Sequence, residues 1–183
     1  MLGKIELKRV HAVTITAVIG SLVALAIAPA AHAQSADLVL CDRIAADPAD
    51  PDRPADVKGV ADIAASDIAT AIKFCKRASA GSRRALYELG RAYAANRQMA
   101  EAMSAYRKAA DKGNSAAMVE LGALLASGSA GPKDETEART LFARAAQAGN
   151  ARGHIVFRAA YAVRHHQTEL KLRLGRVGLR GLR

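Results

Sequence analysis

An internal repeat constrains this chain more than any other feature of its sequence. Residues 85–90 read Ala-Leu-Tyr-Glu-Leu-Gly, and residues 117–122, 32 positions later, read Ala-Met-Val-Glu-Leu-Gly. Residues 102–114 are repeated at 138–150 with an offset of 36, through an alanine, an aromatic residue, an Ala-Ala pair and Gly-Asn. A self-match at this period is typical of stacked helical hairpins rather than of one globular core. The repeat therefore predicts an all-α chain.

Each copy of the repeat reads as a pair of helices. We expect helices at 83–95 and about 98–112 in the first copy, and at about 116–126 and 135–148 in the second. Gly90 and Gly122 lie inside helices, where glycine costs roughly 1 kcal/mol relative to alanine. Their recurrence favours a packing role, in which two helices approach closely and an aromatic side chain fills the remaining gap. Gly113 and Gly149 follow helices at the position where a C-terminal glycine is favoured, and Asp134 with Glu137 reads as a capping box.

These residues resemble the Sel-one-like repeat, a relative of the tetratricopeptide repeat. The matching positions are Ala85, Leu89, Gly90, Tyr93, Ala102, Tyr106, Ala109, Ala110 and Gly113 in the first copy, and Ala117, Leu121, Gly122, Gly128, Asp134, Ala138, Phe142, Ala145, Ala146 and Gly149 in the second. The second copy departs from the pattern at Leu125, which replaces a tyrosine, and in its loop at Ala130 and Gly131. The resemblance implies a short right-handed α-solenoid of antiparallel helix hairpins. It also implies a scaffold, adaptor or regulator that holds a peptide or protein in a groove.

The first 33 residues have the features of a signal peptide. Basic residues precede an apolar run at 12–28, and Ala31-His32-Ala33 forms an A-x-A cleavage site after Pro29. An uncleaved anchor is the rival interpretation, because the run approaches the roughly 20 residues that span a bilayer. We expect cleavage after Ala33 and a periplasmic or secreted protein without a stable membrane anchor.

Cys41 and Cys75 are the two cysteines of the chain. In an oxidising compartment an even pair in a small chain usually forms a disulfide. The alternatives are two buried thiols or a nucleophile, although a nucleophile would need a histidine nearby. No C-x-x-C or helical histidine pair indicates a metal site, and we expect no metal and no cofactor.

Residues 34–81 are expected to form an N-terminal helical cap on the first repeat. The apolar spacing predicts a short helix near 38–45 and a second one at 66–80 with Ser66 as its N-cap. Between them, three prolines within residues 48–54 favour an extended or turn segment. A Cys41–Cys75 bond would tie the two helices together across this segment.

The C-terminal part of the chain contains a failed third repeat and a basic tail. Residues 82–164 would hold the two repeats and a capping helix at about 152–164, because Arg158 replaces the packing glycine. Residues 165–183 alternate leucine or valine with basic residues and glycine, and we expect a disordered tail. Residues 164–183 carry +5 of the formal net charge of +10. The basic balance therefore does not indicate a nucleic-acid partner.

In tetratricopeptide-type hairpins the first helix lines the concave side, which places a candidate binding groove on this chain. The groove residues carried over from the resemblance are Arg84, Tyr87, Arg91, Val119, Arg152 and Ile155. Arginines among apolar residues suit an extended acidic peptide of a partner in the cell envelope. We expect a non-enzymatic interaction protein. The alternatives are a cell-envelope hydrolase, or a tail that binds anionic surfaces.

Overall fold

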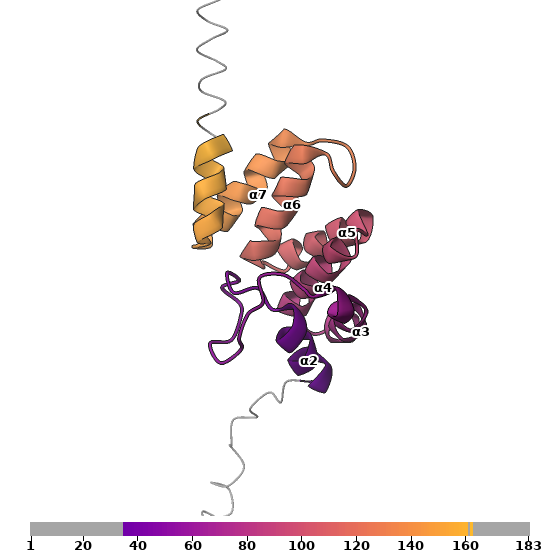
Figure 1. Ribbon diagram of the computed structural model, residues 1–183. Helices are drawn as coiled ribbons and strands as arrows, with labels where there is room; N and C mark the ends of the chain where they lie inside the picture. Colours follow the sequence, from indigo (N-terminus) through magenta and orange to yellow (C-terminus); the bar gives the residue numbers. More distant parts are fainter. Residues whose placement is uncertain (1–34, 161, 163–183) are drawn as a thin grey trace, which may run out of the picture. The chain divides into compact units, whose positions relative to one another are not determined.

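The computed structural model describes residues 35–160 and residue 162 (Figure 1). Its elements are α2 (Ala36–Ala45), the 3-10 turn η1 (Ala65–Asp67), α3 (Ile68–Ala78), α4 (Arg83–Ala95), α5 (Met99–Asp111), α6 (Ser115–Ser127) and α7 (Glu135–Gln147). Residues 151–160 form one more helix, called here the C-terminal helix. No strand occurs in this part of the chain, so the prediction of an all-α fold is confirmed there. Within the same residues, no helix is long and apolar enough to span a bilayer.

The predicted signal peptide and the predicted disordered tail lie outside the described residues. The signal peptide was placed at residues 1–33 and the tail at residues 165–183, and both stay predictions. The predicted capping helix at 152–164 is described only in part, through the C-terminal helix.

The four helices of the repeats lie within one or two residues of their predicted bounds. The packing role of the two helical glycines is also confirmed. A Cβ added at Gly122 would lie 2.5 Å from Cε1 of Phe142, and a Cβ at Gly90 would overlap the ring of Tyr106. In each copy, glycine is the residue that lets the aromatic ring of the second helix pack on the first.

The helix ends agree with the sequence in most respects. Gly113 and Gly149 have φ angles of 87° and 80°, as expected for glycines that end helices. Asp134 Oδ1 caps α7 by accepting from the backbone N–H of Glu137 at 2.8 Å. The reciprocal half of the predicted capping box is wrong, because the Glu137 carboxylate pairs with Arg107 at 2.5 Å instead.

The predicted N-cap at Ser66 is wrong. Residues Ala65–Asp67 form the 3-10 turn η1, and α3 begins only at Ile68. The Asp67 backbone N–H bonds the carbonyl of Ala64 within this turn, and the Ser66 hydroxyl donates to Asp67 Oδ1 at 3.3 Å. A tight turn therefore replaces the first turn of the expected helix.

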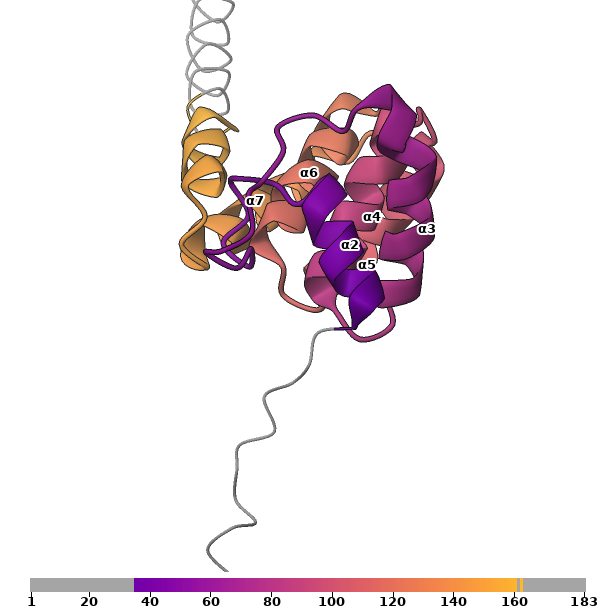
Figure 2. The same cartoon turned by 60° about the horizontal axis from the view of Figure 1, so that its bottom comes forward.

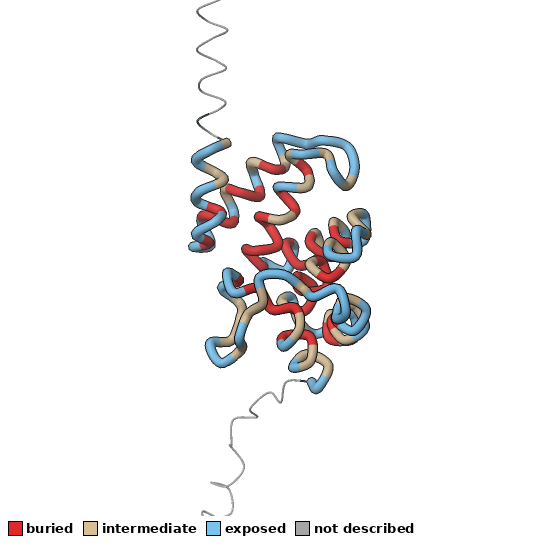
Figure 3. The backbone as a smooth tube through the Cα atoms, in the orientation of Figure 1, coloured by how far each residue is buried: buried red, intermediate tan, exposed pale blue. Residues whose placement is uncertain are grey.

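The helices before the repeats pack against the first helix of the first repeat. Cys41 of α2 and Cys75 of α3 form a disulfide, and both are buried in one apolar cluster with Ala85, Leu89 and Ala92 of α4. Figure 2 shows α2 and α3 alongside α4, and Figure 3 shows the buried positions on the faces where the helices meet. The predicted disulfide is thus confirmed, and it fits an oxidising compartment.

Candidate binding groove

The first half of the candidate groove is occupied by the protein's own chain. Residues 46–64, called here the acidic segment, join α2 to η1 and contain five aspartates but no regular secondary structure. Together with the end of α2, the acidic segment contacts the predicted groove residues Arg84, Tyr87 and Arg91. The three contacts differ in kind and are described in turn.

Arg84 forms a two-pronged ion pair with Asp42. Its Nε and Nη2 atoms donate to the two carboxylate oxygens at 2.8 and 2.9 Å, and Nη1 donates to the carbonyl of Asp52 at 3.2 Å. The Asp42 side chain is almost fully buried. A pair with this geometry neutralises a carboxylate that would otherwise be costly to bury.

Tyr87 is fully buried, and its hydroxyl donates a hydrogen bond to Asp47 Oδ2. Burial and the neighbouring Asp47 both raise the pKa of the Tyr87 hydroxyl. The ring lies 5.8 Å from the ring of Tyr106, centroid to centroid, so Tyr87 also belongs to the apolar core. Tyr87 therefore joins the acidic segment to the core and is not open to solvent.

Arg91 binds the backbone of the acidic segment and of α2. Its Nη1 atom donates to the carbonyl of Ala45 at 2.7 Å. Its Nη2 atom donates to the carbonyls of Val60 and Ala61 at 2.8 and 2.6 Å. Arg91 thus holds both ends of the acidic segment together by satisfying carbonyl groups that no helix pairs.

Two further residues hold the acidic segment and were not among the predicted groove residues. Arg83 pairs with Asp52 at 2.6 and 2.7 Å. Asn114 caps α6 through Oδ1, while its amide donates to Asp50 and Asp52. Burial raises the pKa of Asp50, whose carboxylate accepts hydrogen bonds from the Asn114 amide and from the backbone N–H of Asp52. The charge match between the aspartates and the two successive arginines was the available signal, but it does not reveal which residues pair.

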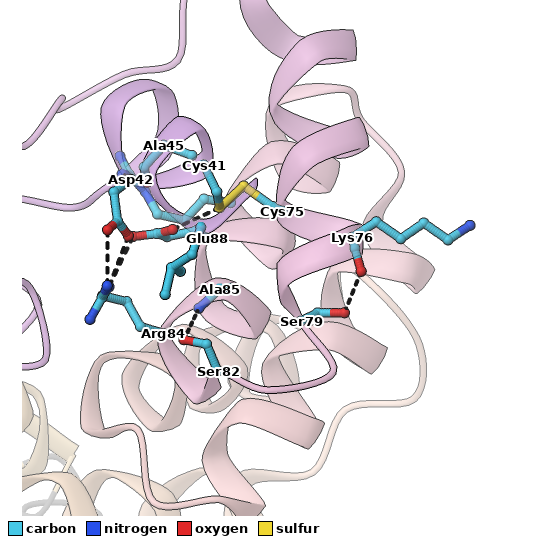
Figure 4. Close-up of a disulfide and its surroundings, with 12 residues drawn as sticks. Cys41, Asp42, Ala45, Cys75, Lys76, Ser79, Ser82, Arg84, Ala85 and Glu88 are labelled. Carbon is cyan, nitrogen blue, oxygen red and sulfur yellow. Dashed lines mark hydrogen bonds and ion pairs between the residues drawn. A yellow bond between two sulfur atoms is a disulfide. The ribbon is translucent and has the colours of Figure 1, made fainter. Parts of the chain in front are cut away.

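Glu88 lies in the same helix as Arg84, Tyr87 and Arg91 and is next to the disulfide (Figure 4). Its Oε2 atom is 2.8 Å from Sγ of Cys41, and the side chain is fully buried. Burial, followed by the neighbouring Asp42 carboxylate, raises the pKa of Glu88 to about 9. A disulfide sulfur carries no proton, so the contact is favourable when Glu88 is protonated and donates to the sulfur.

The second half of the candidate groove is more open. Val119 is buried in the core, whereas Ile155 of the C-terminal helix is 68% exposed. Arg152 pairs with Glu120 of α6 at 2.7 Å, and both side chains are partly exposed. An ion pair in contact with water is easily exchanged for another partner.

A pocket of about 390 Å³ lies between the two halves. It is lined by Asp47, Pro48, Ala61, Asp62, Ile63, Tyr87, Arg91, Ala94, Ala95, Tyr106, Glu120 and Arg152. The structure thus brings three of the six predicted groove residues, Tyr87, Arg91 and Arg152, to one pocket. Val119 and Ile155 are not part of its lining.

Comparison of the chain with protein-family models and with curated proteins finds no match.

Proposed function

We propose that this chain is a non-enzymatic interaction module that binds a short segment of a protein partner in the pocket beside its acidic segment. The observation that carries the proposal is the pocket itself, where Arg91 and Arg152, together with the buried Tyr87, line about 390 Å³. That volume lies near the lower end of the range for ligand pockets, which suits one or two side chains of a partner.

A partner segment that carries a carboxylate is proposed on one group of the pocket, Arg152, because the other charged residues of the lining are Arg91 and the acidic Asp47, Asp62 and Glu120. Arg91 donates to three backbone carbonyls, so Arg152 is the arginine that can change its partner at the least cost. A partner carboxylate would replace Glu120 at the guanidinium of Arg152, in the geometry that arginine favours. Ile155, exposed on the same helix, would add apolar contact.

The proposed class is an exported Sel-one-like repeat protein. Support comes from the glycine–aromatic contact that recurs in both copies and from the packing of α4, α5, α6 and α7 each on the next. Packing between successive helices is expected of a short right-handed α-solenoid. The disulfide supports a periplasmic or secreted location, because such bonds persist in oxidising compartments.

The proposal is tested by site-specific photo-crosslinking in living cells. Ala95 lines the pocket and is exposed, so a photoreactive residue there should capture one dominant partner. Ala100 is an exposed alanine of α5 outside the pocket lining and is the matched control. We expect capture from Ala95 to fall at least tenfold when Arg152→Glu is added. Equal capture from both alanines, or capture from Ala95 unchanged by Arg152→Glu, would exclude the pocket as the binding site.

A further inference from the structure

Three helices bring Cys41, Cys75 and Glu88 to one buried point. The two sulfurs and a Glu88 oxygen all lie within 4.8 Å of one another, and all three side chains are buried. Figure 4 shows the Glu88 carboxyl group directed at the disulfide from α4. The convergence is tertiary, because the two cysteines are 34 residues apart in sequence.

The position of Glu88 is not explained by the packing of the repeat. Its Oε1 atom is buried and accepts no hydrogen bond, and the Arg84 Nε atom is 3.9 Å away. Glu120, the equivalent residue of the second copy, instead makes a direct ion pair with Arg152 at 2.7 Å. The oxidised protein holds the protonated Glu88 carboxyl through Asp42 and the disulfide, whereas a Glu88 carboxylate would have no donor at Oε1. A bound cation would stabilise that carboxylate.

We propose that Cys41, Cys75 and Glu88 bind one thiophilic divalent ion of the Zn²⁺ type when the disulfide is reduced. Two thiolates and one carboxylate form a ligand set that Zn²⁺ accepts, at about 2.3 Å from sulfur and 2.0–2.2 Å from oxygen. The Cα atoms of the two cysteines are 4.8 Å apart, which keeps both sulfurs within reach of a shared ion after the bond opens. The disulfide and the metal site are mutually exclusive, because both use the same sulfurs.

The conversion needs a reductant, and we assign this role to a dithiol. One thiolate of the dithiol attacks a disulfide sulfur, and its second thiol displaces the mixed disulfide. Two electrons pass to the protein, which gains two thiols, and the dithiol becomes a disulfide. When the ion binds, each cysteine thiol releases its proton to solvent and Glu88 coordinates as the carboxylate.

The surroundings of the three side chains suit an ion of charge +2. Two thiolates, Glu88 and Asp42 supply four negative charges, and the ion with Arg84 supplies three positive ones, so the site is nearly neutral. Reduction also breaks the covalent bond between α2 and α3. α2 is then held by noncovalent contacts such as Arg84–Asp42, so the opening that admits the ion costs less.

The experiment titrates Co²⁺ into protein that has been reduced with a dithiol and then freed of it without oxygen. We expect one Co²⁺ per chain, with thiolate-to-cobalt charge-transfer absorption, and no such absorption from the oxidised protein. Glu88→Gln should weaken binding at least tenfold, and Cys75→Ser should abolish the absorption. Glu120→Gln, the same change at the equivalent position of the second copy, should leave Co²⁺ binding unaltered.

Circular dichroism during the titration separates a folded site from thiols of an unfolded chain. The proposal holds if the reduced protein is helical, or becomes helical, as Co²⁺ binds. It is overturned if no charge-transfer band forms, if Glu88→Gln binds as tightly as the wild type, or if binding occurs to a chain that stays unfolded.

Discussion

Glu88 and Glu120 occupy the same position of the repeated hexapeptide and have opposite surroundings. Glu88 is fully buried beside Asp42 and the disulfide, whereas Glu120 is partly exposed and pairs with Arg152. The packing glycine two residues later contacts an aromatic ring in both copies, so the helix hairpins themselves are alike. The difference arises from what lies over each copy. The repeat determines how helices pack, and the segment before it determines which copy remains open.

The sharpest test of this difference compares the two arginines that face these glutamates. Arg84→Ala would leave the buried Asp42 carboxylate without its cation, and we expect a loss of about 3–5 kcal/mol in the free energy of unfolding. Arg152→Ala removes a partly exposed pair, and we expect a loss below about 1 kcal/mol. Urea denaturation of both variants measures the two losses. Similar values would show that the buried and exposed pairs are energetically equivalent and that the comparison is wrong.

Removing the disulfide should weaken the packing of α2 and the acidic segment on the first copy of the repeat. The bond closes a loop across 34 residues of sequence, for which the loop-entropy model gives about 3–4 kcal/mol. We expect the double variant Cys41→Ser/Cys75→Ser to lose this amount of unfolding free energy, measured in urea. A reducing agent should lower the stability of the wild type and leave that of the double variant unchanged. An equally stable double variant would mean that noncovalent contacts alone hold α2.

The two asparagines that cap α6 and the C-terminal helix allow a finer comparison. Asn114 and Asn150 each accept a backbone N–H at the start of a helix, but only Asn114 also donates to the buried Asp50. We expect Asn114→Ala to cost about 2–3 kcal/mol, from a lost cap and an under-satisfied carboxylate. Asn150→Ala should cost less, about 1–2 kcal/mol, from its cap and from the 3.3 Å hydrogen bond that its amide donates to Ser115. Thermal denaturation of both variants tests the order, which would be reversed or absent if the acidic segment did not depend on Asn114.

A further expected effect concerns pH. The pKa of Glu88 is raised to about 9 in the folded protein, from 4.5, so the folded state holds a proton that the unfolded state releases. The stability linked to Glu88 is therefore full below about pH 4.5 and is lost as the pH rises towards 9. We expect the wild type to lose at least about 1.4 kcal/mol, one pKa unit's worth, between pH 5 and pH 8.5.

Two glutamine variants separate the contribution of Glu88 to this pH dependence from that of other groups. Glu88→Gln resembles the protonated side chain and should show a flatter dependence of unfolding free energy on pH. Glu120→Gln should keep the slope of the wild type. A slope shared by all three proteins would mean that Glu88 is ionised in the folded state at neutral pH.

The helices of the repeats could be predicted closely because their signals are local and occur twice. Gly90 and Gly122 each mark a close approach, and Gly113 and Gly149 each mark a helix end. Ser66 was misassigned because serine is a common cap and nothing nearby in the sequence announces a 3-10 turn. Local sequence patterns indicate where a helix can begin, and tertiary contacts determine at which of several neighbouring residues it does begin.

The sequence could predict which helix face carries the candidate groove. It could not predict that the acidic segment covers the first half of that groove. Arg84, Tyr87 and Arg91 were expected to meet a partner, and in the structure they contact Asp42, Asp47 and the backbone of the acidic segment. These contacts join residues 30 to 46 positions apart, and aspartates between prolines also suit ordinary turns. The sequence could indicate complementary charge, whereas the pairing depends on how α2 lies over α4.

The contacts of Asn114 with the acidic segment have a consequence for folding cooperativity. In a simple repeat array each unit contacts only its neighbours, and units can unfold from one end. Here the acidic segment is bound by Arg83 of the first copy and by Asn114 at the start of the second. Separating the two copies at their boundary therefore also breaks contacts of the acidic segment. This small chain is expected to unfold in one step, as a single unit.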